Sequence, residues 1–317
     1  MNKLKKIGLT ALAGSMVATA ATAADVTIAT SWGLSYTGCD SDENCGATSW
    51  AMDDSVKFTT TGELDNGWTA TAYFELDAWQ GPDSPFDDKK LTLDMGDMGI
   101  VGFGDGAAHG YGIDKVKNFV PGADTPIYSM GGITDLTYVG GAGSTGNLAY
   151  QLAIGDTGLT VGAEQEVDAA GGYSRSVSVH YDNPDLGFSF GVGTSDLAPD
   201  NGSGGNTETA IGAKFVTGNF TIGANHNEID YGAAATNDID NQHYGVSYAV
   251  NDDLTISYAR LNNSRDTAAE DEEETMIAAS YTMGSIKFAG YIGKQASVSG
   301  VAGDDDAVKH LTMSLTF

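Results

Sequence analysis

The chain has 317 residues, with 43 acidic residues against 15 basic ones, and it contains 14 Tyr, 11 Phe and 4 Trp. Its formal net charge of −28 at pH 7 argues against nucleic acid as a partner, because phosphates are neutralised by lysine and arginine. Disorder is the simplest alternative for so acidic a chain, but disordered segments lack the aromatic and β-branched residues that are spread along this one.

Residues 1–23 have the three parts of a secretory signal peptide. The first six residues include three lysines, residues 7–20 are mostly apolar and small, and Ala21-Thr22-Ala23 fits a cleavage site. The apolar part is too short to span a bilayer as a helix, and no later apolar run is long enough. Removing the segment leaves 12 basic residues against 43 acidic ones, a net charge of −31. We therefore expect a mature chain of residues 24–317 that is periplasmic, outer-membrane or secreted.

Two cysteines follow, Cys39 and Cys45. In an exported protein, cysteines this close in sequence predict a local disulfide. Residues 40–44 resemble the start of a calcium-binding loop, but Cys45 stands where such a loop needs Gly, and Ala51 where it needs Glu. No cofactor is expected, and a loop-bound Ca²⁺ is left as an open alternative.

Most of the remaining chain alternates apolar and polar residues, which indicates strands with one apolar and one polar face. In residues 308–317, for example, Leu311, Met313 and Leu315 share one face. In chain order, the predicted strands are residues 25–36, 55–64, 68–79, 89–95, 98–104, 146–154, 158–167, 173–181, 186–194, 207–216, 219–229, 241–250, 253–261, 275–282, 285–294 and 306–317. A soluble sandwich would give the same pattern in any single strand.

The connections between these strands alternate between short turns and long polar loops. Asp65-Asn66-Gly67 is a strong signal for a tight hairpin turn. Such alternation is typical of outer-membrane barrels, whose long loops lie on one side. Residues 133–139 also alternate, but counting them as a strand would put the later loops on the wrong side, so we place them inside a long loop of residues 105–145. The sequence therefore predicts a single all-β domain, a 16-stranded antiparallel transmembrane β-barrel.

At this point the mature chain resembles the general bacterial porins of the Rhodobacter type. The resemblance rests on the signal peptide, the strand count, the 65–67 turn, the terminal Phe317 and a long loop that begins Gly102-Phe103-Gly104-Asp105-Gly106. It implies that the third loop folds into the barrel and forms the constriction. It also implies that three barrels associate as a homotrimer, and that Phe317 is the signal read by the assembly machinery.

The candidate pore residues come from this loop and from inward positions of the strands. The loop contributes Asp105, Asp114, Asp124, Asp135, His109 and Tyr111, and the strands contribute Lys57, Lys90, Glu75, Asp77, Asp94 and Glu164. We hypothesise that some of the loop acids line the pore and attract cations. The alternative is that they are ordinary solvated acids. His109 and Tyr111 either narrow the pore or pack the loop against the wall.

The basic residues depart from the pattern of the resembled family, whose constrictions set loop acids against an arginine cluster. Arg175 and Arg260 fall at outward positions, and Arg265 is predicted to lie in a loop. The inward basic candidates are therefore Lys57, Lys90, Lys214 and Lys287. We expect a weaker positive field on the wall than in that family.

Two acidic runs, residues 270–274 and 304–306, are predicted to lie in outer loops. Divalent cations could link them to each other or to lipopolysaccharide phosphates, but a hydrated acidic rim is an equal alternative. Neither run has the spacing of a formed calcium site.

These observations favour a diffusion porin of the Gram-negative outer membrane that passes small hydrophilic solutes and prefers cations. The main alternative is a substrate-specific channel for a sugar or an amino acid. An outer-membrane enzyme needs a nucleophile and a base near the rim, and no such arrangement stands out, so no enzymatic activity is predicted. A soluble adhesin is the remaining possibility.

Overall fold

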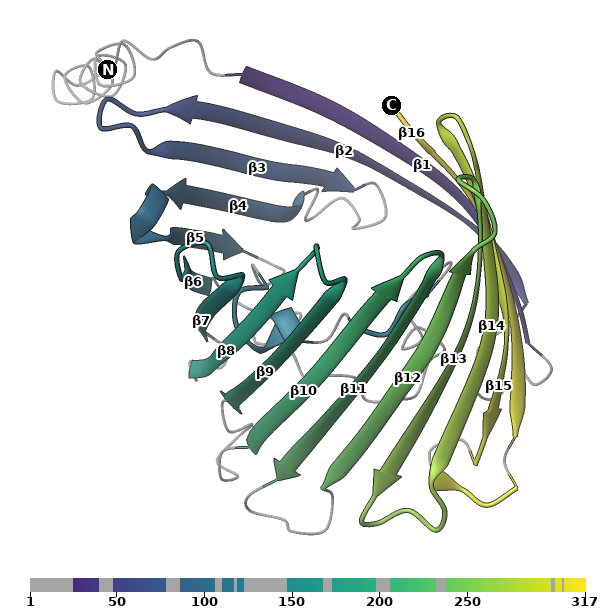
Figure 1. Cartoon of the computed structure of the whole chain (residues 1–317). Coiled ribbons are helices and arrows are strands. Elements are labelled where there is room, and N and C mark those ends of the chain that lie inside the picture. The colour runs from purple at the N-terminus through teal and green to yellow at the C-terminus, as the bar shows by residue number, and fades with distance from the viewer. Residues whose placement is uncertain are drawn as a thin grey trace, which may run out of the picture.

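The computed structural model describes residues 25–39, 48–77, 86–105, 110–116, 119–122, 147–167, 173–197, 206–231, 238–297, 300–303 and 305–317. Within these residues sixteen strands close into one barrel (Figure 1). The strands are β1 (Asp25–Cys39), β2 (Ser49–Glu63), β3 (Thr69–Asp77), β4 (Phe86–Asp94), β5 (Ile100–Asp105), β6 (Asn147–Ala153), β7 (Leu159–Val167), β8 (Tyr173–Asn183), β9 (Phe188–Leu197), β10 (Asn206–Thr217), β11 (Phe220–Tyr231), β12 (Ile239–Ala249), β13 (Leu254–Arg265), β14 (Glu272–Met283), β15 (Ile286–Ala296) and β16 (Asp306–Thr316). The predicted fold class is confirmed.

Each strand pairs antiparallel with its neighbours in the chain, and the last strand closes the barrel against the first. β16 pairs with β1 from Thr316, opposite Ser31, to Val308, opposite Cys39. Beyond this ladder, the backbone groups of Phe317 and Thr30 exchange two hydrogen bonds of 3.0 Å. Closure satisfies backbone groups that lipid cannot hydrogen-bond, which a membrane-spanning sheet requires.

The strand bounds also confirm the predicted alternation of connections. Residues 64–68 join β2 to β3 and residues 218–219 join β10 to β11, whereas residues 106–146 lie between β5 and β6. The strand ends joined by short turns lie at one end of the barrel, and the strand ends joined by long connections lie at the other (Figure 1). Gly67, with φ of 80°, provides the left-handed backbone of the first turn. Residues 133–139 lie outside the described residues.

Several strand ends differ from the prediction, β2 for example beginning at Ser49 instead of residue 55, and those of β13 and β14 change where charged residues lie. β13 continues to Arg265 and β14 starts at Glu272, because Asn263 pairs with Glu272 and the ladder extends beyond the apolar segments. The acids Glu272 and Glu274 therefore lie on a strand and are each 1% exposed, rather than forming a hydrated rim. Arg265, predicted to lie in a loop, ends β13 with its Nη2 atom 3.9 Å from Glu272 Oε2. Apolar alternation underestimated the lengths of β13 and β14, because these strand ends carry polar residues on both faces.

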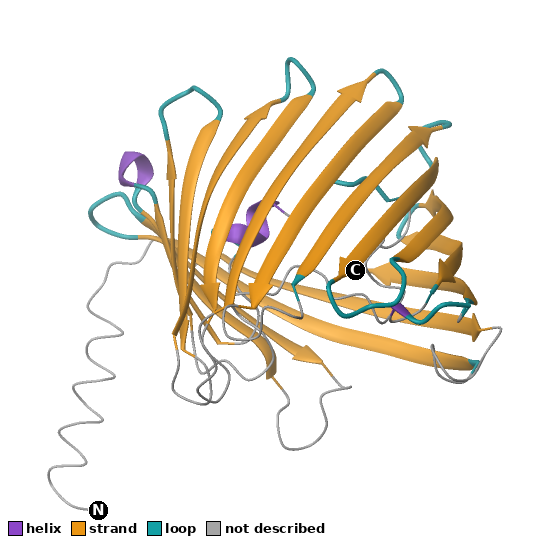
Figure 2. Ribbon diagram, turned by 90° about the horizontal axis from the view of Figure 1, so that it is seen from below, coloured by secondary structure: helices purple, strands orange, loops and turns teal. Residues whose placement is uncertain are grey.

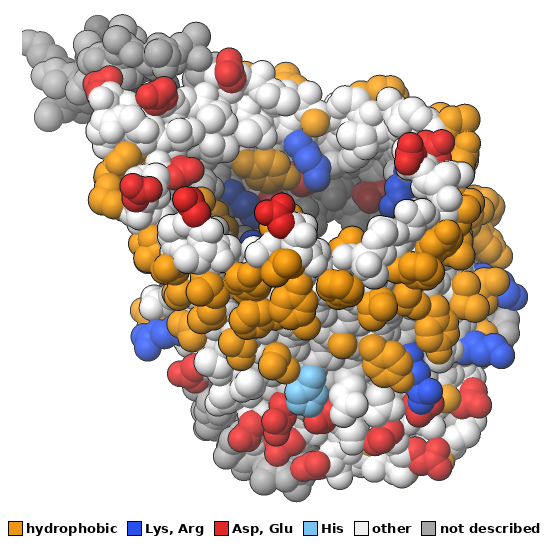
Figure 3. Space-filling model, viewed as in Figure 1, with side chains coloured by type: hydrophobic (Ala, Val, Ile, Leu, Met, Phe, Trp, Pro, Cys, Tyr) orange, Lys and Arg blue, Asp and Glu red, His pale blue; other side chains and the backbone are white. Residues whose placement is uncertain are grey.

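The two faces of the sheet have the reverse polarity of a soluble protein. In β8, Ser176 and Ser178 are 2% and 4% exposed, whereas Val177 and Val179 between them are 52% and 37% exposed. The space-filling view shows the exposed apolar side chains as a band across the visible face of the barrel, with charged side chains beyond it (Figure 3). An apolar outside and a polar inside are what a barrel in lipid needs.

Part of the loop between β5 and β6 lies inside the barrel. Its short helix η3 (Ile113–Val116) is enclosed by strands, as the view from below shows (Figure 2). Ile113, Val116 and Phe119 form a small apolar cluster there with Ala210 of β10. A second short helix, η2 (Gly96–Met98), forms the turn between β4 and β5. No described helix is long and apolar enough to cross a membrane.

Candidate pore constriction

The loop segment that contains η3 is tied to the inner wall by hydrogen bonds to its backbone. The amide of Gly112 donates to Glu164 Oε2 of β7 at 3.2 Å, and the amide of Ile113 donates to Ser176 Oγ of β8 at 3.1 Å. The hydroxyl of Ser178 donates to the carbonyl oxygen of Tyr111 at 3.1 Å. Because buried backbone groups need partners, these polar wall residues fix where the loop lies.

A second anchor lies on β11. The side chain of Asn225 accepts a hydrogen bond of 3.2 Å from the amide of Phe119 and donates one to the carbonyl oxygen of Val116. The Phe119 ring is 2% exposed and stacks on the His180 ring, with 5.6 Å between the ring centroids. The Asn225 side chain therefore bonds to the loop backbone at two points, Val116 and Phe119.

Glycines on the wall allow the loop to come this close. A Cβ atom at Gly162 would lie 1.5 Å from the carbonyl oxygen of Tyr111, and one at Gly223 would lie 1.8 Å from that of Phe119. At Gly212 it would lie 2.3 Å from the Phe119 ring. Such contacts are impossible for any larger residue, so the wall positions under the loop require glycine.

Two predicted loop residues lie in this docked segment. Asp114 is 6% exposed, so its carboxylate is covered where the loop meets the wall. Tyr111 is half-buried, and burial together with the nearby carboxylate of Glu164 raises the pKa of its phenol. His109, Asp124, Asp135 and the side chain of Asp105 lie outside the described residues.

The wall formed by β2, β3 and β4 carries the predicted basic residues. Lys57 Nζ lies 3.2 Å from Glu75 Oε1, and Lys90 Nζ lies 3.2 Å from Asp88 Oδ2. The Tyr73 hydroxyl donates to Glu75, and Lys90 Nζ is 6.0 Å from the centre of the Tyr73 ring. Alternation predicts that Lys57, Lys90 and Glu75 face inward. In the structure they lie together on one wall, where each lysine is beside an acid.

Two further predicted residues, Asp94 and Phe317, are described. Asp94 is exposed at the end of β4, where it accepts a 2.9 Å hydrogen bond from the amide of Gly96. Phe317 is 70% exposed at the barrel seam. The side chains of Asp77 and Cys39, and all of Cys45, lie outside the described residues. Within the described part of the chain, no group of three His, Cys, Asp or Glu residues could hold a metal ion.

Sequence reasoning missed the polar wall residues that hold the loop, namely Ser176, Ser178 and Asn225. Their polarity was consistent with a wet lumen, so nothing marked them as anchors. The available signal was a set of glycines at inward positions next to such polar residues. Gly191 and Gly193 on β9, for example, face Phe119 and Ile113 of the loop.

The sequence pattern of the Gram-negative porin family matches residues 8–310. The chain belongs to this family. As a porin with a closed 16-stranded barrel, it is a multi-pass protein of the outer membrane that forms a diffusion channel. No curated protein matches the sequence.

Solved porin structures share the fold at low sequence identity. A refined porin structure is 17% identical with a TM-score of 0.69, over 92% of this chain and 100% of the other. The anion-selective porin of Comamonas acidovorans is 14% identical with a TM-score of 0.66, over 93% and 100%. A mutant of the Rh. blastica porin is 15% identical with a TM-score of 0.65, over 92% and 100%.

Proposed function

We propose that this outer-membrane channel passes small hydrophilic solutes and prefers cations. The observation that carries the preference is the pairing of two of the four inward lysine candidates, those on the β2–β4 wall, with carboxylates: Lys57 with Glu75 and Lys90 with Asp88, each at 3.2 Å. A cation beside an anion at this distance contributes little net field a few ångströms away. Meanwhile Asp53 and Asp94, at inward positions of β2 and β4, are exposed and add negative charge to the same wall.

The loop of residues 105–145 serves as the constriction in this proposal. Support comes from its described segment, which lies inside the barrel on the wall of β7–β11 and so occupies part of the lumen. The space-filling view shows that a hollow nevertheless remains, with basic and acidic side chains at its edge (Figure 3). Solutes would pass between the docked loop and the charged wall of β2–β4.

Three further parts of the proposal concern export and assembly. Residues 1–23 are an export signal that is removed, Phe317 is read during barrel assembly, and three copies form a homotrimer. The signal peptide composition and the family resemblance support them. Mass spectrometry of the protein from outer membranes would show a chain that starts at Ala24, and the mass of the intact assembly would correspond to three chains.

Reversal potentials in a salt gradient across a planar bilayer test the ion preference. For the wild type, we expect a reversal potential whose sign shows a higher permeability to cations than to anions. Glu75→Gln should shift the potential toward anions because Lys57 loses its partner, whereas the outward-facing Glu273→Gln should leave it unchanged. A wild-type potential of the opposite sign would refute the preference, though not the channel.

A further inference from the structure

Two lysines lie beside the docked loop segment, on the wall opposite in character to that of β2–β4. Lys115 belongs to η3 itself, and Lys214 is at an inward position of β10, two residues beyond Gly212. Both are partly exposed. Unlike Lys57 and Lys90, neither forms an ion pair with a described residue. We call Lys115 and Lys214 the loop-side lysines.

The pairing of the strands fixes the place of Lys214. It lies opposite Ser189 of β9 and opposite Gly223 of β11, and side chains that lie opposite each other across a ladder are within contact. A Cβ atom at Gly223 would lie 1.8 Å from the carbonyl oxygen of Phe119, so the docked segment passes directly beside Lys214. The lysine therefore stands at the edge of the loop, on the side of the short turn at residues 218–219.

The place of Lys115 is fixed by the backbone around it. Its amide donates a hydrogen bond of 3.1 Å to the carbonyl oxygen of Gly112, and the next residue, Val116, is fully buried. A Cβ atom at Gly191 of β9 would lie 3.4 Å from Val116 Cγ2, so η3 rests on this strand. Lys115 thus extends from an anchored turn and not from a free loop.

The side chain of His180 on β8 shows that the two lysines are close in space. His180 lies opposite Gly191 in the pairing of β8 with β9, and its ring stacks on Phe119 of the loop. The charges of Lys115 and Lys214 both act on this ring. Both ammonium groups therefore lie near one side chain of the wall, although the two lysines are 99 residues apart in the sequence (115 to 214).

The inner wall between the docked segment and the short turns carries little negative charge. Among the described strand residues that face inward there on β7–β11, Asp182 is the one acid, and it accepts a hydrogen bond from Ser189. Glu164 and Glu208 lie further from the short turns and are 3% and 0% exposed, and Asp114 of η3 is 6% exposed. This part of the lumen is therefore positive, in a chain with a formal net charge of −28.

The two ammonium groups determine which ligand fits. A lysine attracts anions as a compact point charge and does not impose the planar geometry of a guanidinium group. Lysine is accordingly a common phosphate binder. An anion with two charges interacts favourably with both lysines, whereas a monovalent anion compensates only one. Binding by two mobile side chains is weak, which suits a solute that must also leave the channel.

We propose that Lys115 and Lys214 bind a small divalent oxyanion such as phosphate inside the lumen, on the short-turn side of the docked loop. The anion lies between the two ammonium groups and next to His180. The site rests on the water-filled lumen of the proposed channel, but not on which ions the channel prefers. The lysines of the β2–β4 wall form no such site, because Lys57 and Lys90 each already have a carboxylate partner.

The test measures binding of inorganic phosphate to the purified protein in detergent by isothermal titration calorimetry, at about pH 8, where phosphate is mostly divalent. An exposed charge pair changes an equilibrium constant by about fivefold, so Lys115→Gln and Lys214→Gln should each bind phosphate about fivefold more weakly. The double variant should bind about 25-fold more weakly. Lys115→Arg/Lys214→Arg keeps both charges and should bind as the wild type does.

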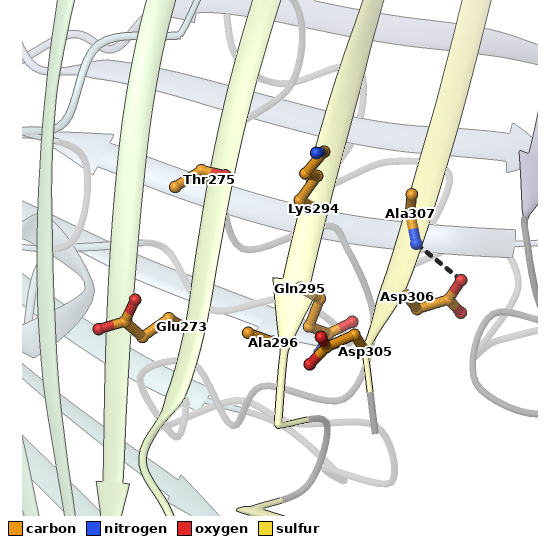
Figure 4. A pocket seen from close by; sticks show the side chains of 8 residues that line it. All are labelled: Glu273, Thr275, Lys294, Gln295, Ala296, Asp305, Asp306 and Ala307. Atoms are coloured by element: carbon orange, nitrogen blue, oxygen red, sulfur yellow. Dashed lines mark hydrogen bonds between the residues drawn. The ribbon is translucent and has the colours of Figure 1, made fainter. Parts of the chain in front are cut away.

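Two control variants remove a lysine elsewhere. Lys287→Gln removes another inward lysine, on β15. Lys294→Gln removes an exposed lysine of β15 beside a pocket of about 480 Å³, which Glu273 and Asp305 also line (Figure 4). Both controls should bind phosphate as the wild type does. A loss in Lys287→Gln equal to that in Lys214→Gln would mean that phosphate responds only to the total charge of the lumen, which overturns the site.

The remaining outcomes are equally decisive. Equal phosphate binding by the wild type and the double glutamine variant would overturn the proposal. Competition by acetate at the concentrations where phosphate binds would show a site for any small anion and refute the preference for divalent ones. If the double variant does not fold, the two single variants provide the test. A wild type that binds phosphate but conducts no ions in a planar bilayer would refute the channel and not the site.

Discussion

Two parts of the inner wall differ in what they contact. The wall from β7 to β11 has glycines such as Gly162 and Gly223 under the loop, and side chains such as Asn225 that bond to the loop backbone. The wall from β2 to β4 instead carries the ion pairs of Lys57 and Lys90. The first wall positions a piece of protein, and in our proposal the second faces the solutes. Substitutions on the first should therefore change the size of the pore, and those on the second its ion preference.

The largest effect is expected from Gly162→Ala. The new Cβ atom would meet the Tyr111 carbonyl oxygen at 1.5 Å, so the loop must move away from the wall into the lumen. Overpacking of this kind costs about 1–3 kcal/mol. Single-channel conductance should fall, and the variant should unfold at lower denaturant concentration than the wild type.

Gly33→Ala provides the matched control for this substitution. Gly33 also lies on the inner face, but its added Cβ would be 3.4 Å from the Asp53 Cβ, which is an ordinary contact. Conductance and stability should remain those of the wild type. Equal conductance in the two variants would contradict the distinction between the walls.

The next effect in size is expected from Asn225→Ala, which leaves the Phe119 amide and the Val116 carbonyl group without their wall partner. An unpaired buried group costs about 1–3 kcal/mol. The loop should loosen, and the open-channel current should become noisier without a change of reversal potential. Asn227→Ala is the control, because Asn227 lies two residues along the same face and donates a hydrogen bond to Glu208 instead. It should not change the current noise.

The two walls also differ in how much of their structure could be predicted from the sequence. Alternation with a period of two predicts which residues of a strand face inward, so Lys57, Glu75 and Lys90 could be placed on one wall. Strand number and turn positions follow from the same pattern and from turn residues such as Asn66-Gly67. The docking of the loop depends on contacts such as Phe119 with Asn225, 106 residues apart, which no local pattern encodes.

A smaller effect is expected at the charged wall from Lys57→Gln, which leaves Glu75 without its lysine. Glu75 is 9% exposed and Lys57 is partly exposed, so we take the ion pair as worth about 1 kcal/mol and expect the ratio of cation to anion permeability to rise about fivefold. The reversal potential in a salt gradient measures this ratio. The conductance should stay close to that of the wild type, because Lys57 lies on the wall away from the docked loop segment, and a large loss of conductance would mean that the two walls are not separable.

The smallest effect concerns Tyr111, whose phenol is acted on by the charges of Glu164 on the first wall and Asp94 on the second. Burial raises the pKa of its phenol above the ordinary value of 10, so the folded state holds this proton more tightly than the unfolded chain does. The docked loop is thus unaffected below pH 10 and loses stability as the pH rises above 10 toward the raised pKa. Tyr111→Phe removes this loss, and the difference in current noise between the two proteins should grow from about pH 9 to about pH 11. A constant difference over that range would show that the phenol is open to the pore rather than packed between loop and wall.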